Sequence, residues 1–122
     1  GAARLTDYCS SKWAAVGFDE SLRMELRHSA PGSNTTVVYP FLIETGMFKG
    51  AQTRFPFPLP ILKEANVADQ IVESIAKKHK KLILPSFVTL VPIFRILPTY
   101  VFDKIADFLG INDAMDKFTG RP

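Results

Sequence analysis

The sequence predicts an α/β fold built on parallel strands. Two short apolar runs, residues 35–39 and 82–84, are rich in β-branched or aliphatic side chains and are typical of buried strands. Each run follows a longer segment with helical periodicity, at about residues 8–28 and 66–81. Helix, strand, loop, helix and strand in this order indicate parallel strands joined by a right-handed crossover. The 122 residues, 47% of them hydrophobic, suit one modest domain.

The first helix is expected from about residue 8 to residue 28. Its apolar stripe would consist of residues at three- and four-residue steps, namely Ser11, Ala15, Phe18, Leu22 and Leu26. Asp7 is placed to cap it. Gly17 costs about 1 kcal/mol against alanine in a helix interior, so we expect close packing at that position. Pro31 and Gly32 end the helix.

The chain leaves the first strand at Pro40, which cannot continue a strand ladder. The following loop therefore departs from the carboxyl end of the strand, where open α/β sheets bind their ligands. Residues 46–62 then form an apolar loop region, in which Pro56, Pro58 and Pro60 forbid a regular helix. Such a loop lines a pocket, packs on a core or touches a membrane.

The second helix is expected to begin at Asn66 or Asp69 and to end in the basic run at residues 77–81. Cations at a helix carboxyl end suit its negative dipole, and no aromatic residues interleave with them. We therefore interpret this run as a solvated helix terminus and expect no nucleic-acid partner.

Residues 86–122 form a hydrophobic C-terminal extension. Arg95 is the only charge between residues 82 and 102, but prolines at 85, 92 and 98 argue against a straight membrane-spanning helix. Shallow contact with a membrane and a hairpin facing a pocket or core both remain open. A last helix is expected over residues 99–109, with Gly110 as its stop.

The cysteine and histidine content of the sequence gives little support for a disulfide bond or a metal site. Cys9 is the single cysteine, so it has no internal disulfide partner and is compatible with a reducing compartment. His28 and His79 are far apart and lack the cysteine spacing of a zinc site, so no metal is expected.

Tyr8 and Lys12 carry the strongest chemical signal. Residues four apart lie on one helix face, about 6 Å apart along the axis. A nearby cation favours the ionised form of a phenol, so this pair suits a general acid or base. Tyr100 and Lys104 have the same spacing, so the spacing alone does not establish a site.

The context of the pair resembles the C-terminal half of a classical short-chain dehydrogenase/reductase. Tyr8-x-x-x-Lys12 on a long helix is followed by the strand at 37–40 and by Ile43-x-Thr45-Gly46-Met47. Finer features, residues 7–15, 45–48, 109–111 and 114–116, look like the membrane-associated retinol and hydroxysteroid dehydrogenases.

The resemblance implies the C-terminal part of a Rossmann-type doubly wound parallel sheet, namely its last two strands with their helices. Residues 1–122 would be one partial domain, with 46–62 as a substrate loop and the N-terminal nucleotide-binding half missing. The catalytic serine and the structural asparagine of the family precede the Tyr–Lys pair and are not in this chain. We therefore expect a segment of a longer protein that is inactive on its own.

The implied activity is NAD- or NADP-dependent interconversion of a hydrophobic alcohol and its carbonyl, the alcohol being a retinoid, a steroid or a long-chain alcohol. Tyr8 would be the acid/base, and Lys12 would favour its ionisation and bind the nicotinamide ribose. Ile43 would meet the carboxamide through its backbone, and Thr45 the carboxamide or pyrophosphate side. The implied cofactor-binding residues are Tyr8, Lys12, Pro40, Ile43 and Thr45, and the implied substrate-lining residues are Phe41, Met47, Phe48 and Phe55. Phe41 departs from the glycine of many relatives.

The resemblance also implies intracellular association with the endoplasmic reticulum membrane or lipid droplets, and a homodimer through the helix at 8–28. A second interpretation stays open, in which the chain is a noncatalytic module that binds lipid or a membrane surface. The sequence leaves the cofactor type, the substrate and the reaction direction open.

Overall fold

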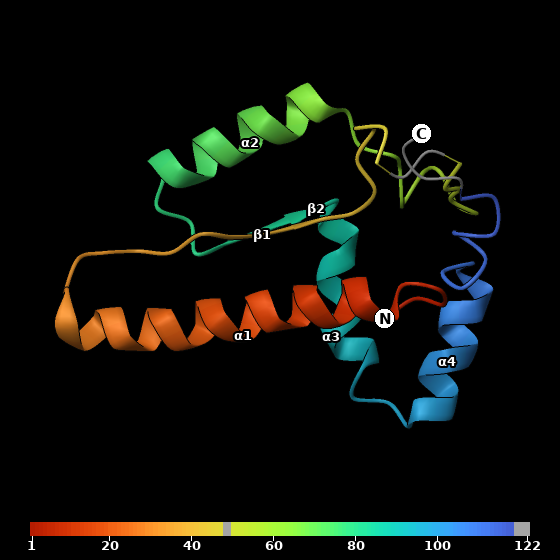
Figure 1. Ribbon diagram of the computed structural model, residues 1–122, viewed down its shortest axis with the longest axis horizontal. Helices are drawn as coiled ribbons and strands as arrows, with labels where there is room; N and C mark the ends of the chain where they lie inside the picture. The colour runs from red at the N-terminus through yellow and green to blue at the C-terminus, as the bar shows by residue number, and fades with distance from the viewer. Residues whose placement is uncertain (48–49, 119–122) are drawn as a thin grey trace.

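The computed structural model describes residues 1–47 and 50–118. Two short strands, β1 (Val37–Pro40) and β2 (Lys81–Leu84), form a parallel sheet in which Val37 is paired with Lys81 and Pro40 with Leu84. The helices α1 (Thr6–Ser29) and α2 (Glu64–Ala76) lie on opposite sides of this sheet (Figure 1). The predicted α/β class and the parallel pairing are confirmed.

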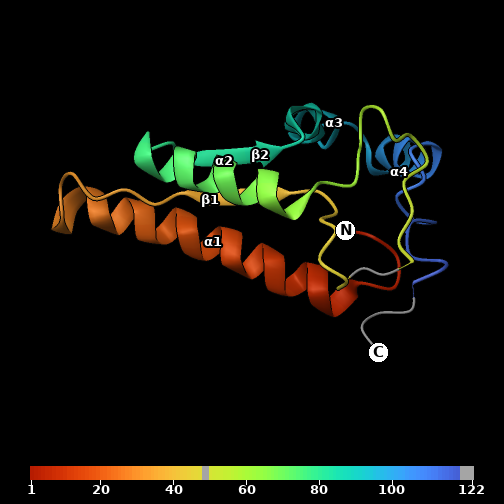
Figure 2. The ribbon, with the colours of Figure 1, turned by 90° about the horizontal axis from the view of Figure 1, so that it is seen from above.

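Helix α1 forms where the periodicity predicts it, but its predicted cap and stripe are partly wrong. The helix begins at Thr6 with Leu5 at the N-cap, and Asp7 lies inside the first turn. Leu22 and Leu26 are half-buried, whereas Phe18 is 69% exposed. The two-stranded sheet covers only a narrow line along the helix, so the rest of the predicted stripe faces outward (Figure 2). A side chain at Gly17 would meet no described atom within 4 Å, so the expected close packing is not found.

Helix α2 begins at Glu64, with Lys63 as its N-cap, rather than at Asn66 or Asp69. It turns Val67 and Ser74 inward, and both are buried. The basic run that follows is exposed, as expected for a solvated helix end. The hydroxyl of Thr36 donates a hydrogen bond of 2.8 Å to the carbonyl of His79 and ties this end to the chain before β1.

Three short helical segments follow β2, namely η1 (Ser86–Leu90), α3 (Val91–Phe94) and α4 (Thr99–Phe108). As predicted, α4 gives way to Gly110, which adopts a left-handed φ of 72°. Across the described ranges, none of the helices is both long and apolar enough to cross a membrane.

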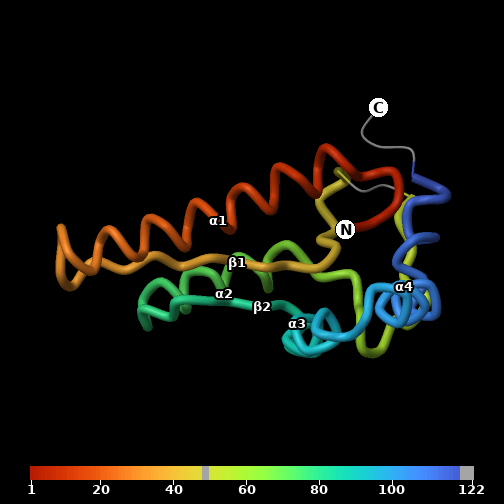
Figure 3. The backbone as a smooth tube through the Cα atoms, turned by 90° about the horizontal axis from the view of Figure 1, so that it is seen from below, coloured from red at the N-terminus to blue at the C-terminus, as the bar shows by residue number. Residues whose placement is uncertain are grey.

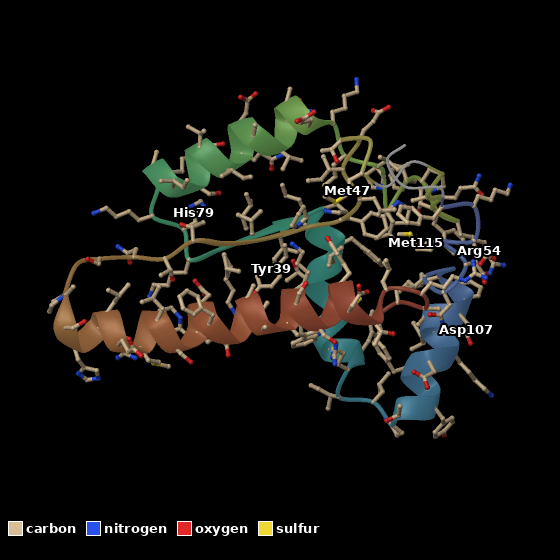
Figure 4. The ribbon with its side chains drawn as sticks, viewed as in Figure 1. Tyr39, Met47, Arg54, His79, Asp107 and Met115 are labelled. Atoms are coloured by element: carbon tan, nitrogen blue, oxygen red, sulfur yellow. The ribbon has the colours of Figure 1, made fainter. Side chains whose placement is uncertain are left out.

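A second small core lies away from the sheet, where the proline-rich loop meets α4. Leu59, Ala106 and Met115 are buried there, and the rings of Phe55 and Phe108 are 5.6 Å apart. The Gln52 N–H donates to the carbonyl of Ala114, and Figure 4 shows Met115 and Arg54 on this side of the molecule. Phe55 and Leu59 of the proline-rich loop therefore pack on a core of their own, which is one of the three roles predicted for this loop.

Candidate active site

Tyr8 and Lys12 lie in the first two turns of α1. The helix runs antiparallel to the strands, so its N-terminus is at the carboxyl end of the sheet (Figure 1). Tyr8 is half-buried and Lys12 is exposed. The Lys12 ammonium lies 5.1 Å from the centroid of the Tyr8 ring, which is cation–π distance. The predicted pair therefore meets in space.

A cavity of about 390 Å³ lies between α1, the sheet and the segment formed by η1 and α3. Its walls are mostly apolar, and one end is formed by the Tyr8–Lys12 pair. Its lining consists of Tyr8, Cys9, Lys12, Trp13, Val16, Tyr39, Lys81, Ile83, Val88, Val91, Pro92 and Arg95. Figure 3 shows the backbone around it, with α1 on one side and α3 on the other. Its volume is that of a small-molecule site.

Tyr39 lies between β1 and α1 (Figure 4), where it lines the cavity. Burial raises the pKa of its phenol above the ordinary value of 10.0, and the carboxylates of Asp19 and Glu20 raise that pKa further. Tyr39 therefore keeps its proton at neutral pH. The sequence identified Tyr39 only as a strand residue and not as part of a cavity. The signal that could have identified it is the alternation of side chains along a strand, which turns every second residue to the same face of the sheet.

Arg95 closes the far side of the cavity. Its guanidinium lies 4.6 Å from the centre of the Trp13 ring and 5.9 Å from the centre of the Phe102 ring. The sequence identified Arg95 as the single charge in a hydrophobic segment, and no role was predicted for it. Nothing in the local pattern places it beside Trp13.

The loop after β1 is held by backbone hydrogen bonds. The Phe41 N–H donates to the carbonyl of Leu84 at 2.7 Å. Leu62 then pairs with the loop, because its N–H donates to Leu42 and its carbonyl accepts from Glu44. In this parallel bridge the N–H and C=O of Ile43 point away from Leu62.

Ile43 lies in a second cavity of about 390 Å³, which it lines with Glu44, Gly46 and other loop residues. Its carbonyl accepts the Thr45 N–H at 2.8 Å. Within the described residues its own N–H has no hydrogen-bond partner. The structure thus places Ile43 and the Tyr8–Lys12 pair in two separate cavities.

The remaining predicted residues are distributed as follows. Pro40 ends β1, and Thr45 lines neither of the two cavities. Of the predicted substrate-lining residues, Phe41 is half-buried next to the sheet, Met47 is exposed and Phe55 stacks on Phe108, and none of them lines either cavity. Phe48 lies outside the described residues. Their contact with substrate stays a prediction.

Two other sequence patterns can be placed. Tyr100, the second tyrosine with a lysine four residues later, is 67% exposed on α4 and lines neither cavity. Across residues 1–47 and 50–118, no three His, Cys, Asp or Glu side chains gather as a metal site would require.

A Tyr–Lys pair at the head of a helix, at the carboxyl end of a parallel α/β sheet, is the arrangement expected of a short-chain dehydrogenase/reductase. Comparison with known proteins gives the same class. The chain is 40% identical over 123 residues to epidermal retinol dehydrogenase 2 of Mus musculus, with 99% of the chain and 40% of the relative covered. It is 40% identical over 116 residues to human short-chain dehydrogenase/reductase 3, with 94% and 38% covered.

Human retinol dehydrogenase 10 is 36% identical over 124 residues, with 98% of the chain and 36% of the relative covered. No family model matches the chain, and no solved structure does. The chain belongs to the short-chain dehydrogenase/reductase family and lies near its retinol dehydrogenases. It spans about 40% of the length of the curated relatives that it matches.

Proposed function

We propose that the chain is the C-terminal part of an NAD(P)-dependent oxidoreductase that interconverts a hydrophobic alcohol and its carbonyl. The observation that carries the proposal is the Tyr8–Lys12 pair beside an apolar cavity. The names of the relatives support a retinoid as the alcohol, with steroids and long-chain alcohols as alternatives. In this proposal residues 46–62 serve as the substrate loop of the partial domain.

Proton transfer falls to Tyr8. In the direction of oxidation its phenolate oxygen accepts the proton of the substrate hydroxyl, and in reduction its phenol returns that proton to the carbonyl oxygen. Lys12 places its ammonium 5.1 Å from the centre of the Tyr8 ring and so supplies a cation beside the reacting group. The cavity beside Tyr8 has mostly apolar walls, which suit a hydrophobic substrate.

A nicotinamide cofactor is part of this proposal, and the backbone at Ile43 supports it. The N–H of Ile43 is directed away from its bridge partner and is available to a carboxamide oxygen. Tyr8 and Lys12 would hold the ribose hydroxyls, with Pro40 and Thr45 beside the ring. NAD or NADP, when bound, supplies the hydride acceptor or donor. The second cavity is lined by the loop that follows β1, at the carboxyl end of the strands, where α/β sheets bind dinucleotides.

The test is turnover by the full-length protein with retinol and with a long-chain alcohol, in the presence of NAD or NADP. Tyr8→Phe is expected to lower the rate by at least about 100-fold, the range of general acid–base catalysis. Cofactor affinity should stay nearly unchanged. Tyr100→Phe is the matched control and should keep full activity. Full activity in Tyr8→Phe would refute the mechanism.

Membrane or lipid-droplet association is a separate proposal, supported by apolar side chains that the extension leaves exposed. Ile93 is exposed, and Ile96 is 84% exposed next to it. Exposed patches of this kind mark interaction surfaces. Ile93→Ser with Ile96→Ser should reduce cofractionation of the full-length protein with membranes, and unchanged cofractionation would count against this surface.

Pairing of two copies through residues 8–28 is also proposed. Phe18 and Met24 are both exposed on α1. Phe18→Glu should shift a full-length dimer toward monomer in analytical ultracentrifugation. An unchanged dimer would place the interface elsewhere.

A further inference from the structure

The cavity beneath α1 continues beyond Tyr8 to residues that have no part in the proposed reaction. Trp13 and Val16 continue one wall along α1, while Val88, Val91 and Pro92 form the opposite wall. Ile83 of β2 contributes to its sheet side. The cavity is therefore a mostly apolar site whose lining extends well beyond Tyr8.

Three cations, Lys12, Lys81 and Arg95, line this apolar cavity, and no carboxylate does. None of the three forms an ion pair with a residue that the structure describes. Two other cations on the surface do form ion pairs: Arg4 pairs with Asp116, and Lys77 pairs with Glu73. Unpaired cations around low-dielectric walls attract an anion.

Arg95 is the best placed of the three to bind a carboxylate. The rings of Trp13 and Phe102 hold its guanidinium at the rim. Stacking uses the faces of the guanidinium and leaves the N–H groups at its edge, which match a carboxylate in bidentate geometry. Among the described residues the backbone N–H of Arg95 donates to the carbonyl of Val91, but its guanidinium donates no hydrogen bond.

The charges around the cavity also differ between its two ends, so an anionic head group is favoured at one end. Asp19 and Glu20 act on Tyr39 from the α1 side, so an anionic group near Tyr39 would be repelled. In the part of the chain that the structure describes, the Arg95 guanidinium contacts the rings of Trp13 and Phe102 and no carboxylate, so this end is the favoured place for negative charge. The hydrocarbon part of a ligand would then cover the apolar walls.

We propose that this cavity binds a free single-chain amphiphilic carboxylate, with its head group on Arg95 and its hydrocarbon chain along Val88, Val91 and Ile83. This goes beyond the proposed oxidoreductase function, because it requires neither a nicotinamide cofactor nor proton transfer. The volume of about 390 Å³ suits one such molecule.

The test is calorimetric titration of the full-length protein, without cofactor and at low salt, with three probes below their micelle concentrations. Dodecanoate, dodecanol and dodecyltrimethylammonium share a chain length and differ in charge. Dodecanoate should bind most tightly, at least about fivefold more tightly than the cation, and added salt should weaken dodecanoate alone.

Variants locate the head group. Arg95→Gln should weaken dodecanoate binding about three- to fivefold without changing dodecanol binding, and Arg95→Lys should restore it only in part because the planar fork is lost. Lys81→Gln should give a smaller loss. Lys80→Gln is the matched control, since Lys80 is exposed next to Lys81 but does not line the cavity.

Equal affinity for the three probes would overturn the proposal, as would equal losses in Arg95→Gln and Lys80→Gln. Absence of dodecanoate binding would also overturn it and would indicate that another part of the full-length protein fills the groove. Because binding is measured without cofactor, a protein that binds dodecanoate but oxidises no alcohol refutes the proposed function only.

Discussion

The ammonium of Lys12 lies 5.1 Å from the centre of the Tyr8 ring, one helical turn along α1. Tyr100 and Lys104 have the same sequence spacing, but no such contact joins them in the part of the chain that the structure describes. A cation at an exposed aromatic face contributes about 0.5–1 kcal/mol. The difference between the two pairs therefore lies in their surroundings, an apolar cavity for one and open solvent for the other.

Lys12→Ala in the full-length protein should lower alcohol oxidation by at least about 100-fold, because the Tyr8 ring loses the cation beside it. Nicotinamide cofactor affinity should fall as well, since the ribose loses a donor. Initial rates and fluorescence titration of the cofactor measure the two effects. Lys104→Ala is the control, and a comparable loss there would mean that general damage explains both.

Gly110→Ala should destabilise the protein by about 1–2 kcal/mol, the cost of placing an L-residue in left-handed backbone. Gly110 has a φ of 72°, and an added Cβ would lie 2.9 Å from the Cβ of Arg54. Urea unfolding measures the change. An unchanged free energy of unfolding would show that the turn after α4 relaxes without cost.

Gly17→Ala is the counterpart inside α1, and there the expected change is a gain of about 0.5–1 kcal/mol from helix propensity. The added methyl would meet no described atom within 4 Å. A loss of stability in the full-length protein would instead reveal another element, or a second copy, packed on this side of α1.

Met115→Ala should lower the free energy of unfolding of the full-length protein by about 2 kcal/mol or more, since this side chain is 6% exposed in the core below α4. Met24→Ala, at a position that is 50% exposed, should change it by less than about 0.5 kcal/mol. Chemical denaturation compares the two. Equal effects would argue that the core around Met115 does not form.

Tyr39 should make stability depend on alkaline pH. Its pKa in the folded protein is raised, first by burial and then by Asp19 and Glu20, so the folded state holds this proton more tightly than the unfolded chain. The contribution is fully present below the ordinary pKa of 10.0 and is lost as pH rises through the higher folded pKa. Unfolding measured from pH 9 upward should show a steeper loss in the wild type than in Tyr39→Phe, and parallel curves would contradict this.

The sequence predicted much of the fold because helices and strands depend on local spacing. Residues 8–28 have helical periodicity and form α1, and the short apolar runs become β1 and β2. The prediction of buried residues failed where burial depended on which element packs against the helix. Phe18 has the spacing of a core residue, yet the two strands are too narrow to cover it.

The features of the candidate site likewise fall into those that follow from local sequence and those that depend on tertiary contacts. By itself the sequence determined that Tyr8 and Lys12 share a helix face and that Gly110 ends α4, because a 3.6-residue turn and the freedom of glycine at positive φ are local properties. Only the tertiary structure decided that Arg95 lies on Trp13 and that Tyr39 lies beneath α1. These contacts join residues distant in the chain, and packing of η1 and α3 beside α1 brings them together.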